Sequence, residues 1–244
     1  MLCTRITFWV LLAPAIVAQS EWSYEGATGP EHWGDLKSEF AACLAGKEQS
    51  PVDIGQVDIK PGTLPEIQFH YKDTPLDLVN TGHSIQVNDA AGSFIEVGGE
   101  RYQLRQLHFH HPSEERIDGQ SFDMVIHLVH ANSKGDLAVV AVLVRIGAAN
   151  ETFGKIESSF PETPSERKPP GVQINPSGLL PPKASYYTFR GSLTTPPCTE
   201  GVTWFVLKTP ITISADQVKA FAAIFPHNAR PIQPLGSRII QSTR

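Results

Sequence analysis

The feature that most constrains the fold of this chain is a succession of short segments rich in β-branched and aromatic residues. These segments are residues 67–71, 76–80, 84–88, 93–97, 101–111, 122–130, 137–146 and 202–208. Turn sequences separate them, at residues 89–92, 98–99, 118–119 and 134–136 among others. Closely spaced strands joined by short turns pair antiparallel. The pattern alone therefore predicts an all-β or β-rich α+β fold.

Two segments have more specific signatures. Residues 137–144 are apolar on both alternating faces, which predicts a strand in the middle of the sheet with cover on each side. Residues 214–225 have helical periodicity; Ser214 and Gln217 have capping-box spacing, and Pro226 ends the run. We expect this helix to pack on the sheet and to carry no chemistry.

The beginning of the chain has the composition of a secretory signal peptide. Arg5 precedes an apolar run at residues 6–17, and small residues lead up to Ala18. The run is shorter than the roughly 20 apolar residues that span a membrane. We expect residues 1–18 to be removed. The remaining chain, residues 19–244, is then a single domain without a membrane anchor, exported to the periplasm or otherwise secreted.

Loss of the leader removes Cys3 and leaves Cys43 and Cys198. Two cysteines in an exported protein most simply form one disulfide, and two buried free thiols are the alternative. The bridge would close a loop of about 155 residues, worth at most about 5 kcal/mol in the chain-entropy model. It also favours an ordered surface loop over an interdomain linker for the proline-rich residues 158–184.

The charge balance excludes one class of partner. The chain has 20 Lys and Arg residues against 25 Asp and Glu residues, a net charge of -5. It therefore lacks the positive field that nonspecific nucleic-acid binding needs.

Three histidines have the pattern of a metal site. His108 and His110 lie two residues apart on one predicted strand, so their side chains share a face about 6.6 Å apart along the strand. The next long strand can offer His127 on the same face, whereas His111 and His130 should face the other way. Three imidazoles leave one tetrahedral position open, as at a catalytic zinc. For the first two alone, a solvent-facing or core histidine pair is the alternative.

Seven segments together carry a resemblance to a known family. They are WSYEGATGPEHWG at 22–34, QSPVDI at 49–54, NTGHS at 80–84, QLHFHHPSEE at 106–115, HLVH at 127–130, GSLTTPPCTEGVTW at 191–204 and NARPIQPL at 228–235. With them, the sequence resembles an alpha-class carbonic anhydrase of the bacterial or extracellular type. The resemblance implies a large, mostly antiparallel twisted sheet of about ten strands flanked by short helices. It also places Cys43 and Cys198 where extracellular members keep a disulfide.

The resemblance also implies a cofactor and a reaction. His108, His110 and His127 would bind Zn²⁺ in a cone-shaped cavity, with water at the fourth position. Zinc lowers the pKa of such a water to about 7, so that hydroxide is available at neutral pH. The family's reaction is the reversible hydration of carbon dioxide to bicarbonate and a proton.

Three polar residues match catalytic positions of the family. Thr194 matches the threonine that orients the hydroxide, and Glu114 matches the carboxylate to which that threonine donates. His83 matches the proton shuttle, because an imidazole with a pKa near 6.5 relays protons around neutrality. Taken singly, the three are a turn threonine, a solvated loop glutamate and a surface histidine. Polar residues expected to support the shuttle are Tyr24, Thr81 and Thr195.

Other matches concern the walls of the cavity and the partners of the ligands. The substrate pocket would be lined by Val129, Val139, Leu193, Thr195 and Trp204. Ordinary sheet packing explains the apolar members equally well. Gln106 matches the outer hydrogen-bond partner of the His108 ring, and Asn228 matches a position that supports His110.

The chain departs from the family at two positions. Two residues before the third ligand the family usually has a glutamate that accepts the free N–H of that imidazole, and this chain has Val125. His127 must then use water, a backbone carbonyl or another side chain. Losing such a partner typically costs about 10- to 100-fold in metal affinity or activity, so we expect faster zinc exchange with retained catalysis. Glu115, where many relatives have histidine, should affect local packing or hydrogen bonding rather than chemistry.

Two other functions remain open on the sequence. One is a catalytically inactive binding or adhesion domain of the same fold, although such relatives usually lose at least one zinc histidine. The other is a zinc hydrolase of esters, which would share the nucleophile and which we expect only as a side activity. We expect a monomer or a homodimer.

Overall fold

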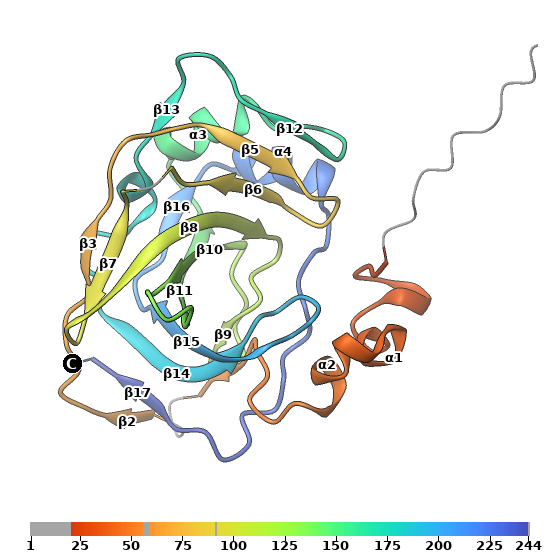
Figure 1. Ribbon diagram of the computed structural model, residues 1–244. Coiled ribbons are helices and arrows are strands. Elements are labelled where there is room, and N and C mark those ends of the chain that lie inside the picture. The colour runs from red at the N-terminus through yellow and green to blue at the C-terminus, as the bar shows by residue number, and fades with distance from the viewer. Residues whose placement is uncertain (1–20, 56–58, 91, 244) are drawn as a thin grey trace, which may run out of the picture.

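The computed structural model describes residues 21–55, 59–90 and 92–243, and the predicted leader at residues 1–18 lies outside the described residues. Most of the strands in the described residues belong to one mixed sheet of 13 strands that curves around the centre of the molecule (Figure 1). Helices in the described part are few and short. The β-rich fold expected from the sequence is confirmed.

The sheet has a continuous path with three strands beside it. The path runs through β12 (Ser165–Arg167), β5 (Asp77–Asn80), β6 (Ile85–Asn88), β8 (Glu100–His110), β10 (Met124–Ala131), β11 (Leu137–Ile146), β15 (Glu200–Leu207), β14 (Tyr186–Ser192), β17 (Ile240–Ser242) and β2 (Ile59–Pro61). Off this path, β16 (Ile211–Ile213) pairs with β11, and β7 (Phe94–Val97) joins β8 to β3 (Gln68–His70). Two small sheets pair β1 (Asp53–Ile54) with β9 (Arg116–Ile117), and β4 (Thr74–Pro75) with β13 (Gln173–Ile174).

Most neighbouring strands in the large sheet are antiparallel, as the short turns predict. The exceptions are β11 with β15, β11 with β16, and β17 with β2, which are parallel. The partners in each of these pairs are joined by long stretches of chain, to which the short-turn argument does not apply.

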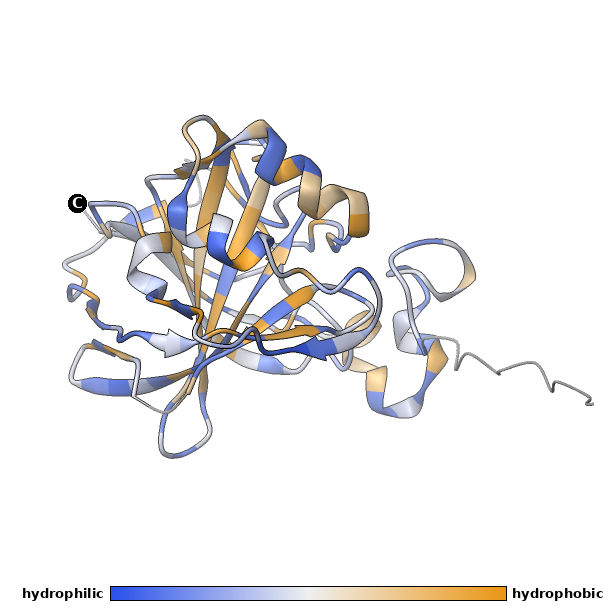
Figure 2. Ribbon diagram, turned by 90° about the horizontal axis from the view of Figure 1, so that it is seen from above, coloured by the Kyte–Doolittle hydropathy of each residue, from blue (hydrophilic) through white to orange (hydrophobic). Residues whose placement is uncertain are grey.

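The strand β11 lies in the middle of the sheet and is covered on both faces. Ala138, Val140, Val142 and Val144 pack into one apolar cluster, and Val139, Ala141 and Leu143 pack into a second on the opposite face. Figure 2 shows apolar residues concentrated along the central strands. The prediction for residues 137–144 is therefore confirmed, and the sheet has two separately packed faces.

Among the described residues, helices contribute to the first of these two clusters and not to the second. Phe153 and Ile156 of α3 (Glu151–Glu157), with Val218 and Phe221 of α4 (Ala215–Ile224), belong to the first cluster. At the start of α4 the Ser214 hydroxyl accepts from the Gln217 backbone and the Gln217 side chain accepts from the Ser214 backbone, so the predicted capping box is present. The second face is left for the functional site.

The proline-rich residues 158–184 form an ordered segment, as expected. Within them, β12 pairs with β5, β13 pairs with β4, and Pro176–Leu179 form a short 3-10 helix (Figure 1). The short helices Gly26–Thr28, α1 (Trp33–Leu36), Ser38–Phe40 and α2 (Ala42–Ala45) come from the N-terminal part of the chain. None of the helices in the described residues is long and apolar enough to cross a membrane.

Candidate metal centre

Three histidines from two neighbouring strands meet on the helix-free face of the sheet. β8 contributes His108 and His110, and β10 contributes His127, which lies opposite His108 in the antiparallel register. One ring nitrogen of each lies within 4.8 Å of the others. The predicted cluster is present. His111 and His130 are not part of it; His130 is fully buried on the opposite face, where its Nε2 bonds to a tyrosine hydroxyl.

Neutral oxygens hold the two rings from β8. His108 Nδ1 lies 2.8 Å from Gln106 Oε1, and His110 Nδ1 lies 2.7 Å from the backbone oxygen of Asn228. These oxygens only accept, so each Nδ1 carries a hydrogen and each Nε2 has a lone pair. His110 Nε2 is buried and has no hydrogen-bond partner among the described residues. A buried nitrogen with a free lone pair fits a metal ion as its missing partner.

A carboxylate holds the third ring. His127 Nε2 lies 3.1 Å and 3.3 Å from the two carboxylate oxygens of Glu115, so Nε2 carries the hydrogen and Nδ1 has the lone pair. Both side chains are buried. Of the three acceptors left open for His127 by the sequence, a side chain is the one present.

Burial shapes the protonation of the cluster. It lowers the pKa of His108 to about 3 and holds the pKa of His110 well below its usual value. Both rings are therefore neutral at pH 7, which is the form that binds metals. Burial also lowers the pKa of His127, but the carboxylates of Glu115 and Glu114 outweigh it, so this pKa lies above the usual value.

A second buried carboxylate borders the cluster. Glu114 Oε2 lies 3.5 Å from His110 Nε2 and 3.9 Å from His127 Nδ1, and Oε1 accepts a 2.7 Å hydrogen bond from the Arg230 backbone. Burial raises the pKa of Glu114 to about 7, although the Thr194 side chain opposes this rise. Thr194 thus lies near Glu114, and their pairing through a hydrogen bond stays a prediction.

A pocket of about 230 Å³ opens from the cluster to the surface. It is lined by Trp22, Tyr24, Thr81, His83, Ser84, Gln86, Gln106, His108, His110 and Thr195. The His83 ring stacks on Trp22 with centroids 3.6 Å apart, and its Nε2 lies 3.0 Å from the Trp22 backbone oxygen. His83, Tyr24, Thr81 and Thr195 thus share one pocket with two of the three clustered histidines.

The other side of the cluster is apolar. Val139 and Trp204 are buried in the second apolar cluster, and Val129 and Leu193 are half-buried against it. The Trp204 ring meets the His127 ring edge-on, with centroids 5.0 Å apart. The four predicted wall residues therefore lie together and belong equally to the packing of the sheet.

A covalent bond and an arginine hold the N-terminal segment against the loop that carries Thr194. Cys43 and Cys198 form a disulfide, as predicted. The buried Arg230 donates from Nη2 to the Cys43 backbone oxygen and from Nη1 to the Ser50 backbone oxygen, both at 2.8 Å. Arg230 therefore connects the frame around the disulfide to Glu114, to which its own backbone N–H donates.

Comparison with known proteins places this architecture in a family. Residues 28–244 match the model of the eukaryotic-type carbonic anhydrases. The chain is 40% identical to a carbonic anhydrase of Nostoc over 93% of its own length and 88% of the relative's, and 43% identical to one of Neisseria gonorrhoeae over 91% and 87%. This chain belongs to the alpha carbonic anhydrase family. The alpha-carbonic anhydrase of Thermovibrio ammonificans, solved with sulfanilamide, superposes with a TM-score of 0.88 at 39% identity, covering 90% of this chain and 98% of the other.

Alpha carbonic anhydrases are zinc enzymes, and the donor set of this member fits that metal. Each of the three rings is buried or half-buried, is held through one nitrogen, and turns the other toward a common centre. Three imidazole nitrogens with room for one more ligand match the donor preference of catalytic zinc.

The two departures of this alpha carbonic anhydrase from the family pattern are connected. Val125 is fully buried in the second apolar cluster and offers no acceptor. Glu115, which we expected to affect packing or hydrogen bonding, bonds directly to the His127 imidazole. The structure thus supplies the acceptor whose absence led us to expect faster zinc exchange.

Sequence reasoning missed three features of the site. It did not connect Glu115 with Val125, although an extra acidic residue beside Glu114 and a missing one at position 125 form a complementary pair. It also missed the contacts of Arg230 and the stacking of Trp22 on His83. Both residues lie in segments that carry the family resemblance, but no local pattern indicates their partners.

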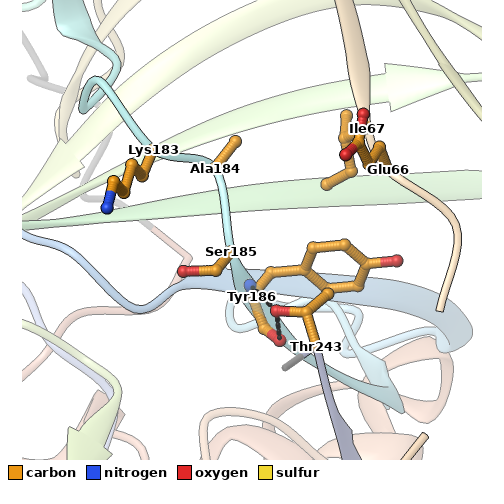
Figure 3. Close-up of a pocket in the computed structure, with 7 residues that line it drawn as sticks. All are labelled: Glu66, Ile67, Lys183, Ala184, Ser185, Tyr186 and Thr243. Carbon is orange, nitrogen blue, oxygen red and sulfur yellow. Dashed lines mark hydrogen bonds between the residues drawn. The ribbon is translucent and has the colours of Figure 1, made fainter. Parts of the chain in front are cut away.

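A second hollow has no comparable chemistry. A pocket of about 360 Å³ is lined by Glu66, Ile67, Lys183, Ala184, Ser185, Tyr186 and Thr243 (Figure 3). The Tyr186 hydroxyl donates to a backbone oxygen, and the Thr243 hydroxyl bonds to the Tyr186 backbone. Its lining contains no histidine or cysteine, so this pocket is not the candidate site.

Proposed function

We propose that this protein catalyses the zinc-dependent, reversible hydration of carbon dioxide to bicarbonate and a proton. The observation that carries the proposal is the buried histidine cluster in a member of the alpha carbonic anhydrase family. His108 and His110 would bind zinc through Nε2, and His127 through Nδ1. Zinc held in this way lowers the pKa of a coordinated water to about 7, which supplies hydroxide at neutral pH.

Thr194 and Glu114 orient the nucleophile in this proposal. Glu114 accepts from the Arg230 backbone, and in this proposal it also accepts from the Thr194 hydroxyl, whose hydrogen is then committed to Glu114. The hydroxyl oxygen is then available only as an acceptor. A hydroxide beside it must donate its hydrogen to Thr194, which directs its lone pair toward the substrate.

The apolar wall holds the substrate. Carbon dioxide is small and has no net charge, so a surface built from Val129, Val139, Leu193 and Trp204 accommodates it without hydrogen bonds. Thr195 lines the adjoining polar pocket. The same nucleophile supports slow cleavage of small activated esters as a side activity, which zinc-dependent hydrolysis of 4-nitrophenyl acetate would measure.

His83 moves the proton between the site and the solvent. Its ring lines the pocket shared with His108 and His110, and an imidazole carries protons in both directions near neutral pH. Burial raises the pKa of the Tyr24 phenol, so Tyr24 stays protonated and can support a chain of water molecules beside Thr81 and Thr195.

The deciding experiment is stopped-flow hydration of carbon dioxide by the purified chain, combined with zinc analysis. We expect one zinc per chain, activity that a chelator removes, and recovery when zinc is returned. An inactive chain without zinc would instead support a binding or adhesion domain. In His83→Ala we expect a rate that is low in dilute buffer and recovers in concentrated imidazole buffer. A defect that buffer fails to rescue would exclude the shuttle.

We also propose export to the periplasm, or otherwise secretion. The disulfide between Cys43 and Cys198 supports this location, because such bonds persist in oxidising compartments. Fractionation of the native host, with N-terminal sequencing of the mature protein, tests both the location and the cleavage after Ala18. The proposed state, a monomer or a homodimer, is tested by light scattering.

A further inference from the structure

We propose that Glu115 is the positioning residue that fixes His127 as a metal ligand and keeps the metal bound for long periods. The inference rests on the zinc site proposed above and concerns a role that the usual family pattern assigns to position 125. It also reverses the expectation of fast zinc exchange, because that expectation assumed that His127 lacks a strong partner.

Among the described residues, the buried Glu115 carboxylate has one side-chain hydrogen-bonding partner. The side chain is fully buried, and within the described residues the imidazole of His127 is the only side chain that donates to it. Burying a carboxyl group is unfavourable unless a donor satisfies it. The hydrogen on His127 Nε2 is therefore the donor on which the buried carboxyl group depends.

The loop before Glu115 aims the carboxylate. The Ser113 hydroxyl donates to the Glu115 backbone oxygen at 2.8 Å and accepts from the Phe122 backbone at 2.8 Å. The Ser113 N–H donates in turn to the Phe122 backbone oxygen at 3.1 Å. Glu115 directly precedes β9, whose Arg116 pairs with Asp53 of β1. The carboxylate thus projects from backbone that is held on both sides.

The residue at position 125 packs in the apolar core and does not hold His127. Val125 lies two residues before His127 on β10 and shares its face of the sheet. It is fully buried, it is paired with Leu143 of β11, and it belongs to the same apolar cluster as Phe122. The role of holding His127 and the role of filling the core are therefore divided between Glu115 and Val125.

The contact determines which nitrogen binds the metal. With both carboxylate oxygens within 3.3 Å of Nε2, the hydrogen is held on Nε2 and the lone pair on Nδ1 points to the cluster. A carboxylate partner also strengthens an imidazole as a donor to the metal. Removing the partner should then weaken metal binding even where the fold is intact.

The test uses the full chain loaded with zinc, with release into excess chelator as the readout. The variants are Glu115→Gln, which is isosteric and uncharged, and Glu115→Ala, which removes the acceptor. The double variant Glu115→Ala/Val125→Glu moves a carboxylate to the other position. The control, Glu157→Gln, makes the same chemical change on α3, which packs on the opposite face of the sheet.

We expect Glu115→Ala to release zinc about 10- to 100-fold faster than the wild type, with Glu115→Gln between the two. The double variant should release zinc more slowly than Glu115→Ala, and the control should match the wild type. Wild-type release rates in both single variants would overturn the proposal, and so would equal acceleration in the control. If Glu115→Ala fails to fold, the zinc release rate of Glu115→Gln decides between these outcomes.

A second readout does not depend on zinc or on catalysis. In the zinc-free wild type, two-dimensional ¹⁵N–¹H NMR should show His127 as the tautomer with hydrogen on Nε2, and in Glu115→Ala this preference should be lost. An unchanged tautomer in folded Glu115→Ala would overturn the proposal. A wild type that shows this tautomer but binds no zinc would refute the proposed function and leave the positioning contact standing.

Discussion

The two strands that supply the histidine cluster surround their rings differently. On β8, an amide oxygen and a backbone oxygen hold His108 and His110, and burial pushes both pKa values down. On β10, a carboxylate holds His127, whose pKa rises in spite of burial. Burial thus lowers the pKa of two rings, whereas neighbouring carboxyl groups raise the pKa of the third. The carboxyl groups of Glu114 and Glu115 both lie near the His127 ring.

Removing a histidine ring from either strand should have the largest effect. The effect should be the same for β8 and for β10. We expect His110→Ala and His127→Ala both to lose stoichiometric zinc and to reduce hydration to the uncatalysed background, because two nitrogens do not retain zinc at a three-histidine site. Zinc analysis and stopped-flow assays measure this. A variant that kept both zinc and activity would show that its strand does not supply a ligand.

Removing the hydrogen-bond partner of one histidine on each strand should affect the two strands differently. Gln106→Leu deletes a neutral acceptor from His108, and we expect zinc release to accelerate by about tenfold, the low end of the range for such partners. Glu115→Ala should exceed it, because a charged acceptor is lost from His127. Chelator-driven release measures both rates side by side. An effect of Gln106→Leu as large as that of Glu115→Ala would remove the distinction between neutral and charged partners.

The opposite face of β10 offers a comparison on a single strand. Burial lowers the pKa of His130 to about 3, far below its value of 6.5 in an unfolded chain. The unfolded state therefore binds the proton first, so this stabilisation is complete above pH 6.5 and is lost as the pH falls toward 3. Between pH 6.5 and 4.5, the unfolding free energy of zinc-free wild type should fall more steeply than that of His130→Gln, by about 1.4 kcal/mol per pH unit. Urea titrations at several pH values measure the difference, and parallel curves would contradict it.

The smallest effect is a difference in titration that leaves the fold unchanged. In zinc-free protein, His127 should gain its proton at a pH above 6.5, because its folded pKa is raised, whereas His108 should stay neutral until far lower pH. The stabilisation from protonated His127 is present below pH 6.5 and is lost as the pH rises through its folded pKa. NMR titration of the imidazole C–H signals follows both rings, and coincident midpoints would contradict the comparison.

Local patterns predicted the parts of this molecule that depend on neighbouring residues. Alternation along a strand placed His108 and His110 on one face, and the two-sided apolar run identified β11 as a central strand. The capping box marked the start of α4, because its two hydrogen bonds span only Ser214 to Gln217.

What the patterns missed depends on how distant segments meet. The parallel pairing of β11 with β15 follows a long connection whose course no periodicity describes. The contact between Glu115 and His127 crosses a turn, and its register decides whether the carboxylate reaches the ring. Arg230 reaches the Cys43 backbone 187 residues away. Family resemblance located several of these residues, but it assigned the partner of His127 to position 125.

The hydrogen bond from His110 to Asn228 spans 118 residues, and the Arg230 backbone donates to Glu114 across 116. A growing chain therefore holds all three histidines long before the residues that orient His110 and Glu114 have been made. Until residues 228–230 are in place, His110 lacks its acceptor and Glu114 lacks its backbone donor, so the site is incomplete. We therefore expect tight metal binding to follow the arrival of this last segment, in whichever compartment folding ends.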